Sequence, residues 1–221
     1  MRVACLQLSS VREQERNFDV VDKLLGEAVQ EGVELALLPE NFASMGCSDQ
    51  QKRSSAEEQH DSSVLRFLAE QAEKHGVAII GGTLLLKGAG DKLRNTCPVF
   101  DARGKLLTVY DKIHLFDMDY QDEFYHESAL IEAGDVPVSV SMGHFKIGLS
   151  ICYDLRFPEL YRSYIEEGCH VLSNVAAFTA TTGHAHWQAL LRARAIENQC
   201  MCWHLHSLEG IPMAGKPGVT V

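Results

Sequence analysis

The amino-acid sequence predicts an α/β fold with mixed sheets. Short apolar strands and amphipathic helices alternate through residues 1–80, which is the rhythm of parallel β-α-β units. Glycine-rich turns then join consecutive strands between residues 83 and 110, and such turns indicate antiparallel hairpins. The chain has 221 residues, of which 46% are hydrophobic and 23% charged, a composition typical of a globular protein with one core. We therefore expect a single domain over residues 1–221.

The first part of the chain predicts three strands with two helices between them. In order, the elements are a strand at 3–8, a helix at 13–30, a strand at 35–38, a helix at 63–75 and a strand at 77–80. The first helix has its apolar side chains on one face, namely Phe18, Val21, Leu25 and Ala28. Pro39 ends the second strand, so Glu40 is expected at a strand's carboxyl end. Open α/β sheets carry their chemistry at these ends.

The chain beyond the hairpins predicts a second set of strands and helices. After a long polar segment at 111–135, the elements are a strand at 136–140, a strand at 145–151, a helix that begins at Pro158 and ends before Gly168, a strand at 171–175 and a helix at 184–200. Pro158 suits the first turn of a helix, where its missing N–H costs nothing. The strand at 145–151 leads directly into Cys152.

Charge and cysteine content restrict the partners and the compartment. A formal net charge of -10 at pH 7 argues against nucleic acid and anionic membrane as partners, because both require a concentrated basic face. Seven cysteines at irregular spacing do not form a disulfide framework and suit a reducing cytosol, so we expect a cytoplasmic protein. No stretch has the length of a membrane span, and the apolar start is too short for a signal peptide.

Cys152 is the first candidate for chemistry. It follows a predicted buried strand and precedes a helix by a few residues. In that position, N–H groups at the helix end favour a thiolate and bind a developing oxyanion. The alternative is a small buried hydrophobic residue, which is the commoner role of a cysteine.

Glu40 and Lys112 are two further candidates. A carboxylate at a strand end suits a general base, although the default role of such a glutamate is a solvated loop acid. Lys112 is flanked by apolar and aromatic residues in the run YDKIHLFD at 110–117. A lysine drawn inward there would stabilise negative charge on a substrate oxygen, whereas the alternative is an ordinary surface lysine.

Three motifs around these residues resemble the nitrilase superfamily of carbon–nitrogen hydrolases, and they occur in that family's order. They are a glutamate motif LLPENF at 37–42, a lysine motif YDKIHLFD at 110–117 and a cysteine motif ICYDLRFPEL at 151–160. A fourth position, Glu127 in FYHES, matches the family's second glutamate. Residues 182–200 resemble the branch of small-molecule amidases that includes deaminated glutathione amidase, and the resemblance covers residues 1–202.

This resemblance implies an α-β-β-α sandwich and covalent catalysis by the cysteine. Glu40 would take the proton of Cys152, the thiolate would attack an amide carbon, and Lys112 with the backbone N–H of Tyr153 would hold the oxyanion. Glu40 would then activate the water that hydrolyses the thioester. Glu127 would orient Lys112 and the substrate. No metal or organic cofactor is required.

The implied substrate is a small linear amide that carries a carboxylate. Deaminated glutathione is the specific expectation, followed by the ω-amide of a short keto acid. Nitrile hydrolysis uses the same residues and remains an alternative. A non-catalytic relative that acts as a dimerisation partner is another, and for an intact fold the resemblance implies a homodimer.

Residues 203–221 do not resemble the family. Family members continue through further strands that close one sheet and through a tail that contributes to the dimer. We therefore expect a sandwich that lacks its C-terminal strands. The exposed sheet edge and apolar surface would lower the stability of such a protein, because net folding stabilities are only about 5–15 kcal/mol.

A cluster of histidines and cysteines near the end of the chain raises the alternative of a zinc site, formed by His184, His186, Cys200, Cys202, His204 and His206. On a helix, His184 and His186 would point to different faces, whereas helical ligand pairs need a spacing of four residues. Structural zinc sites use Cys-x-x-Cys or His-x-x-x-His spacing instead. We therefore expect no metal there.

Overall fold

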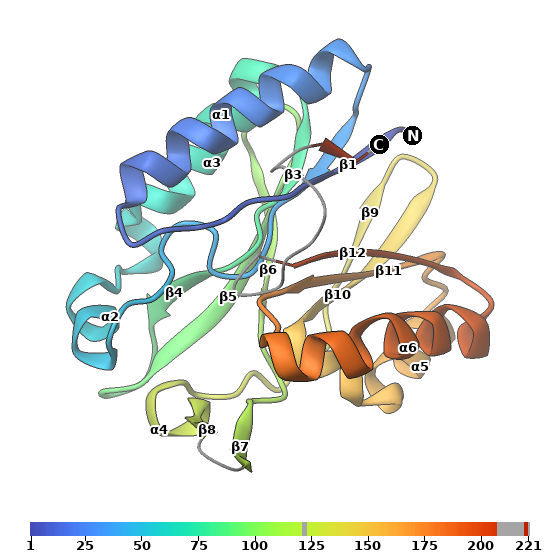
Figure 1. Cartoon of the computed structure of the whole chain (residues 1–221). Helices are drawn as coiled ribbons and strands as arrows, with labels where there is room; N and C mark the ends of the chain where they lie inside the picture. Colours follow the sequence, from blue (N-terminus) through green and yellow to red (C-terminus); the bar gives the residue numbers. More distant parts are fainter. Residues whose placement is uncertain (121–122, 207–218, 221) are drawn as a thin grey trace.

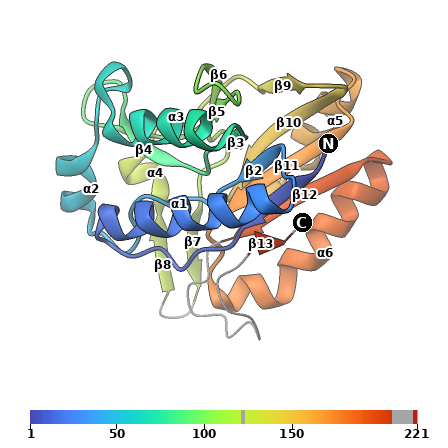
Figure 2. The ribbon, with the colours of Figure 1, turned by 90° about the horizontal axis from the view of Figure 1, so that it is seen from above.

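Two β-sheets stacked face to face and covered by helices on both outer sides form the protein (Figures 1 and 2). The computed structural model describes residues 1–120, 123–206 and 219–220. It confirms the predicted α/β fold with mixed sheets.

The first sheet contains the predicted β-α-β units and hairpins. Its strands, in spatial order, are β13 (Val219–Thr220), β1 (Val3–Leu6), β2 (Leu35–Leu37), β3 (Ala78–Ile80), β5 (Leu93–Phe100) and β4 (Leu84–Lys87), with β6 (Leu106–Asp111) also paired to β5. β1, β2 and β3 run parallel, and β5 pairs antiparallel with β3, β4 and β6. Helices α1 (Gln14–Gln30) and α3 (Ser63–His75) bury their apolar faces against this sheet. The mixed pairing follows from the chain, since helical crossovers join parallel strands and short turns join antiparallel ones.

The second sheet holds the strand that leads to Cys152. Its order is β12 (Met201–His206), β11 (Val171–Ala176), β10 (Phe145–Ile151) and β9 (Ser139–Met142). β10, β11 and β12 are parallel, whereas β9 and β10 form a hairpin. Helices α5 (Pro158–Glu166) and α6 (Ala180–Asn198) cover the outer face.

The main core lies between the two sheets. Leu35 and Leu37 of β2 face Ile147, Leu149 and Ile151 of β10 in one buried apolar cluster. Strands that are buried on both faces read as continuous apolar runs rather than alternating ones, which is why residues 35–38 and 147–151 carry so few polar side chains. The resulting order of layers is α-β-β-α.

Several elements differ from the sequence predictions. The segment 111–135 contains a hairpin of β7 (Asp117–Tyr120) and β8 (Glu123–His126), followed by α4 (Glu127–Leu130). Helix α2 (Asp49–Ser55) was also not predicted, because all seven of its residues are polar and none is buried, so it has no apolar face to detect. The last long helix begins at Ala180 rather than at residue 184.

The segment expected to be atypical, 203–221, lies partly within the described residues. Residues 203–206 continue β12, which pairs in register with β11, and Val219–Thr220 pairs antiparallel with β1. The remaining residues, 207–218 and 221, lie outside the described part. The expected absence of closing strands remains a prediction.

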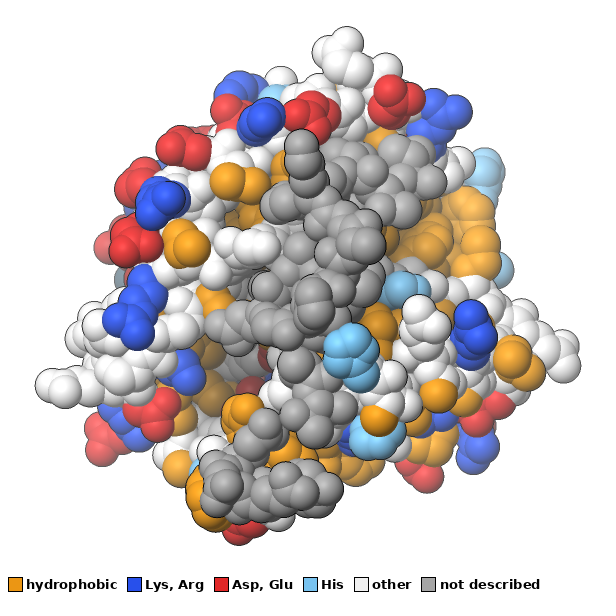
Figure 3. Space-filling model, viewed as in Figure 1, with side chains coloured by type: hydrophobic (Ala, Val, Ile, Leu, Met, Phe, Trp, Pro, Cys, Tyr) orange, Lys and Arg blue, Asp and Glu red, His pale blue; other side chains and the backbone are white. Residues whose placement is uncertain are grey.

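The outer face of α1 and α3 carries acidic and basic side chains in alternation (Figure 3). This face offers no concentrated basic patch of the kind that nucleic acid requires. Among the described residues, no helix combines the length and the apolar composition needed to cross a membrane.

Candidate active site

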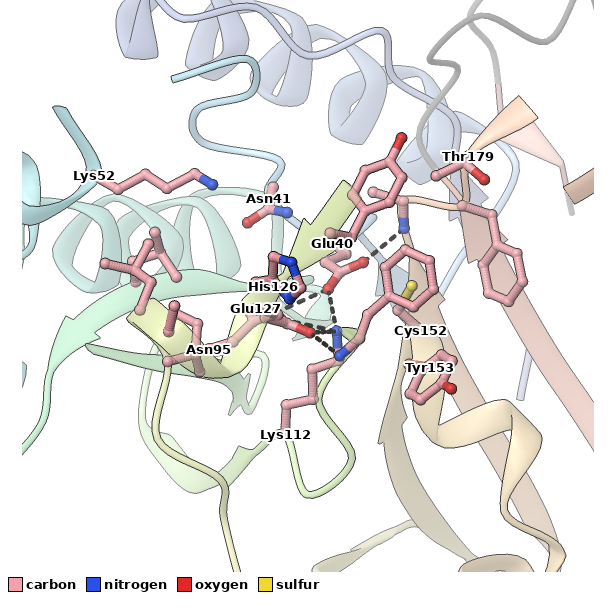
Figure 4. Close-up of a pocket in the computed structure, with 18 of the residues that line it drawn as sticks. Glu40, Asn41, Lys52, Asn95, Lys112, His126, Glu127, Cys152, Tyr153 and Thr179 are labelled. Atoms are coloured by element: carbon pink, nitrogen blue, oxygen red, sulfur yellow. Dashed lines mark hydrogen bonds and ion pairs between the residues drawn. The ribbon is translucent and has the colours of Figure 1, made fainter. Parts of the chain in front are cut away.

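The ends of three strands bring together the residues singled out by the sequence. Glu40 follows β2, Lys112 directly follows β6, and Cys152 directly follows β10. Glu127 is the first residue of α4. Figure 4 shows all four side chains pointing into one cavity. Glu40 and Lys112 come from the first sheet and Cys152 from the second, so the site is assembled across the interface between the sheets.

Lys112 lies between two carboxylates. Its Nζ is 3.3 Å from Oε1 of Glu40, 3.0 Å from Oε1 of Glu127 and 2.8 Å from Oε2 of Glu127. The side chains of Lys112 and Glu40 are only 2% and 4% exposed. Lys112 is therefore not a surface lysine, and the contacts match the predicted pairing of Glu127 with Lys112.

Electrostatics keep Lys112 in its charged form. Burial opposes the charge on Lys112, but the combined attraction of Glu40 and Glu127 outweighs it and raises the pKa of the ammonium group well above its usual range. The site thus contains a buried cation that contacts two carboxylates. Such a preorganised cation in a water-poor setting is suited to hold negative charge on a substrate oxygen.

Cys152 occupies a turn with an unusual backbone conformation. Its φ of 48° lies in the left-handed region, where a non-glycine residue is held by its surroundings. The residue opens a 3₁₀ turn, Cys152–Arg156, just before α5. This strand–turn–helix geometry is the one expected for an exposed nucleophile.

The surroundings of Cys152 favour the protonated thiol. Burial, reinforced by the negative charge of Glu40 and a hydrogen bond to it, raises the pKa of Cys152 well above its usual range, while Lys112 and the N–H of Ala177 act in the opposite direction. A thiol hydrogen-bonded to a carboxylate can transfer its proton directly to that group. Glu40 is thus positioned to accept the proton from the nucleophile.

Glu40 is held by backbone and side-chain donors. Its Oε2 accepts a 2.8 Å hydrogen bond from the N–H of Ala177, which follows β11. The next residue, Asn41, has a φ of 55° and donates its backbone N–H to Oγ1 of Thr83 at 2.9 Å. Together with Lys112 from the first sheet, the N–H of Ala177 from the second holds the carboxylate of Glu40.

Tyr153, the predicted oxyanion donor through its backbone, lines the same cavity. Its ring lies 5.1 Å from that of Phe116 and 5.5 Å from that of Phe157. Phe116 itself donates its backbone N–H to Oε2 of Glu127 at 2.6 Å. These contacts link the wall of the cavity to the charged cluster.

Asn95 is a site residue that the sequence interpretation missed. Its Nδ2 lies 2.9 Å from Oε1 of Glu40 and 3.5 Å from Oε1 of Glu127, while its Oδ1 has no hydrogen-bond partner among the described residues. The side chain is 3% exposed. The available signal was an asparagine inside a strand, a position where asparagine is disfavoured.

The cavity has a volume of about 1010 Å³ and is open to solvent, at the upper end of the range of about 300–1,000 Å³ for small-molecule sites. Leu85, Leu130 and Ile131 contribute apolar wall, and Lys52 and Arg156 contribute cationic side chains. The cavity is thus lined both by the reactive cluster of Glu40, Lys112 and Cys152 and by two further cations, Lys52 and Arg156.

Within residues 1–120, 123–206 and 219–220, no three histidine, cysteine, aspartate or glutamate side chains are grouped so as to hold a metal ion. His204 lies in β12 rather than on a helix, with its ring 5.6 Å from that of Trp187.

The sequence and the fold both match known proteins. The family model for carbon-nitrogen hydrolases matches residues 2–205, three residues beyond the predicted limit of 202. A deaminated glutathione amidase from Synechocystis sp. is 42% identical over 202 residues, which cover 89% of this chain and 74% of that protein. An omega-amidase, NIT2, from Mus musculus is 38% identical over 199 residues, covering 88% and 69% respectively.

A solved structure matches as well. Nit3 of Saccharomyces cerevisiae, a member of branch 10 of the nitrilase superfamily, superposes with a TM-score of 0.84 at 30% identity. The match covers 97% of this chain and 78% of that one.

Proposed function

This chain belongs to the carbon–nitrogen hydrolase family of the nitrilase superfamily, and from that membership we propose that its substrate is a small linear amide bearing a carboxylate, with deaminated glutathione as the specific candidate. The chain is an amidase that acts on carbon–nitrogen bonds other than peptide bonds, in the branch that contains deaminated glutathione amidase and omega-amidase. One observation carries the proposal: a single cavity contains both the Glu40–Lys112–Cys152 cluster and the cation Arg156.

In the first half of the reaction, Cys152 forms a thioester with the acyl part of the substrate. Glu40 accepts the thiol proton as sulfur bonds to the amide carbon, and the carbonyl oxygen becomes an oxyanion. Lys112 and the backbone N–H of Tyr153 stabilise that oxyanion. The carbon–nitrogen bond then breaks, the proton passes from Glu40 to the nitrogen, and an amine or ammonia leaves.

In the second half, water regenerates the enzyme. Glu40 removes a proton from the water, which attacks the thioester carbon and forms a second oxyanion at the same position. The carbon–sulfur bond breaks, the acid product leaves, and Cys152 regains its proton. Glu127 acts throughout by holding Lys112, which it contacts with both carboxylate oxygens.

The distribution of charge in the cavity supports a substrate carboxylate. Arg156 lies 3.2 Å from His186 and 5.6 Å from the ring of Tyr153, so its described contacts are with an imidazole and aromatic rings rather than with a carboxylate. Lys52 is 3.5 Å from Asp49. An arginine without an acidic partner, at the edge of a site, is suited to a planar carboxylate.

The size of the cavity favours a larger amide within this class. A volume of about 1010 Å³ exceeds what the ω-amide of a short keto acid would fill, and deaminated glutathione is the larger of the two candidate amides. Nitrile hydrolysis would use the same cluster. The three groups held in contact argue against the non-catalytic alternative, because a pseudoenzyme has no chemical need for all of them.

The proposal also includes the cellular compartment and the oligomeric state. We place the protein in a reducing compartment such as the cytoplasm, because all seven cysteines, each within the described residues, are free thiols. We also propose a homodimer, by analogy with the family, and sedimentation velocity of the full chain would test it.

A panel of amides tests the proposed function. Purified full chain should hydrolyse deaminated glutathione, with the acid product and the released amine detected by mass spectrometry, and Cys152→Ala should abolish the reaction. Turnover of the ω-amides of short keto acids in preference to deaminated glutathione would move the assignment to the second candidate. No turnover of any panel member by folded wild type would refute the amidase proposal for this chain.

The role of Arg156 has its own control in the same panel. Arg156→Leu should raise KM for carboxylated amides by about 10–100-fold, since a charge-assisted hydrogen bond contributes about 1.5–3 kcal/mol. The same variant should change KM for an uncharged amide of similar size by less than about threefold. Equal effects on both substrates would contradict carboxylate binding by Arg156.

A further inference from the structure

Asp154 is a fully buried carboxylate that the proposed reaction does not use. Its side chain is 0% exposed, and a carboxylate is seldom buried without several hydrogen-bond donors around it. Asp154 lies two residues after Cys152, inside the 3₁₀ turn. Its contacts, rather than its position in the sequence, indicate its role.

Four donors surround this carboxylate, and three of them come from the segment that carries Lys112. Oδ2 accepts from the hydroxyl of Tyr110 at 2.7 Å, and Oδ1 accepts from the backbone N–H of His114 at 2.9 Å and lies 2.7 Å from Nδ1 of the same histidine. Tyr110 and His114 stand two residues before and two residues after Lys112. One carboxylate thus holds both sides of the lysine.

The fourth donor comes from the cysteine turn itself. The backbone N–H of Ile151 donates to Oδ2 of Asp154 at 2.8 Å. Ile151 directly precedes Cys152, whose φ of 48° requires support from its surroundings. The hydrogen bond closes the turn around the cysteine.

A ring contact reinforces the same link. The imidazole of His114, from the lysine segment, stacks on the ring of Phe157 with centroids 3.7 Å apart and planes 10° apart. Phe157 donates its own backbone N–H to the carbonyl of Asp154 at 3.0 Å. The cysteine turn and the lysine segment are therefore joined by the side chain of Asp154 and by the ring of Phe157.

Hydrogen bonds between the cysteine turn and the lysine segment can fix the relative position of the two sheets. Lys112 belongs to the first sheet and Cys152 to the second, and the core between the sheets is apolar. Apolar packing is not directional, so it tolerates small sliding movements of one sheet over the other. Hydrogen bonds are directional, so those that converge on the carboxylate of Asp154 fix the position of one sheet relative to the other, which apolar packing alone does not do.

We propose that Asp154 is a positioning residue that holds the Cys152 turn and the Lys112 segment in register across the two sheets; this role rests on the proposed function. The hydrogen bonds from Tyr110 and His114 set the place of Lys112, and the bond from Ile151 sets the place of Cys152. Asp154 acts through these residues and does not touch the substrate.

Asp154→Asn tests this role, because it keeps the shape of the side chain but replaces one accepting oxygen with a donor. We expect kcat to fall about 100-fold with KM within about threefold, since a displacement of about 1 Å at a reactive centre has an effect of that size. The rate of Cys152 alkylation by iodoacetamide, followed by mass spectrometry of the peptide containing it, should fall about tenfold as Lys112 moves away from the sulfur.

Tyr164→Phe is the matched control. The buried side chain of Tyr164 donates its hydroxyl to the carbonyl of Leu149 and accepts from the N–H of Val138 at 3.3 Å. Removing the hydroxyl breaks both hydrogen bonds, but neither reaches the lysine segment. Its kcat and alkylation rate should stay within about threefold of wild type. Equal losses in both variants, or wild-type values in folded Asp154→Asn, would overturn the proposal.

Two further comparisons keep the outcome decisive. If Asp154→Asn does not fold, His114→Ala takes its place. It removes the Nδ1 donor and the stacking ring but leaves the hydroxyl of Tyr110 and the backbone N–H of residue 114. In this variant kcat should fall about tenfold, and an unchanged kcat would overturn the proposed role of Asp154. If wild type lacks amidase activity, the proposed function fails, but the alkylation rates still test the link between Asp154 and Cys152.

Discussion

Nδ2 of Asn95 donates a hydrogen bond of 2.9 Å to Oε1 of Glu40, the same oxygen that lies 3.3 Å from Nζ of Lys112. Lys112 and Asn95 are the side chains that separate Glu40 from Glu127. A single lysine charge cannot neutralise two carboxylates, so the neutral amide of Asn95 provides the additional donor without adding charge. The close approach of Glu40 and Glu127 therefore depends on the amide of Asn95.

Asn95→Asp should replace the hydrogen bond to Glu40 with electrostatic repulsion. A third carboxyl would face Glu40 and Glu127, and like charges would raise its pKa. We expect kcat at pH 7.5 to fall about 100-fold, and to recover in part as the pH is lowered, because the protonated carboxyl donates a hydrogen bond again. The measurement is a pH profile of kcat between pH 5 and 8, given the substrate of the proposed reaction.

Asn95→Ala is the control for that profile. It removes the donor without adding a carboxyl, so its activity should be low without any recovery at acidic pH. An identical pH profile for the two variants would show that the introduced carboxyl does not interact with the glutamates.

The two glutamates should differ in how much they contribute to turnover. Glu40 lies beside Cys152, whose pKa its negative charge raises, and 3.3 Å from Nζ of Lys112, whereas Glu127 contacts Lys112 and the N–H of Phe116. Glu40→Gln should lower kcat by about 1,000-fold or more, since it removes the group that exchanges the proton. Glu127→Gln should lower kcat by about 10–100-fold, because it only loosens the lysine. Steady-state kinetics of the two isosteric variants would distinguish them, and a reversed order would contradict the assigned roles.

Cys152 should alkylate slowly near neutral pH. Burial and the charge of Glu40 raise its pKa, and a raised pKa means that the reactive thiolate appears only as the pH rises above the usual thiol range of about 8–9. The iodoacetamide rate should therefore increase steadily from pH 7 to 10 without a plateau below about pH 9. Glu40→Gln removes one cause of the shift, so alkylation at pH 8 should become faster while turnover is lost. Faster turnover or slower alkylation in that variant would contradict this account.

The fold was largely predictable because the central strands of both sheets are recognisable in the sequence. Strands such as 35–38 and 145–151 are apolar runs, and their surroundings of glycine and proline set the boundaries. The α2 helix escaped prediction because it is polar and has no buried residue, and the β7–β8 hairpin because its strands are only four residues long and mix acidic with aromatic side chains. Their conformations depend on local hydrogen bonds, such as the cap of α2 at Ser48.

The site was predictable only in part. Glu40, Lys112 and Cys152 lie in motifs that are recognisable one at a time, and the structure brings them together although they are far apart in the chain. Asn95 and Asp154 were missed as functional residues because their importance lies in contacts between distant segments. No pattern in the sequence around Asn95 predicts its contact with Glu40, which lies 55 residues earlier in the chain.

Gly82→Ala should disable the site through the backbone beside Glu40. Gly82 has a φ of 56°, and a Cβ there would lie 2.1 Å from the carbonyl oxygen of Pro39, so the chain carrying Glu40 would have to move. Gly143→Ala isolates the conformational part of the effect, because Gly143 has a φ of 58° and nothing within 4 Å of the added Cβ. Gly143→Ala should lower the free energy of unfolding by about 1–2 kcal/mol with kcat unchanged. Gly82→Ala should lower it by about 3 kcal/mol or more and reduce kcat at least tenfold, as measured by urea denaturation and steady-state kinetics. Equal effects of the two substitutions would show that the contact with Pro39 does not position Glu40.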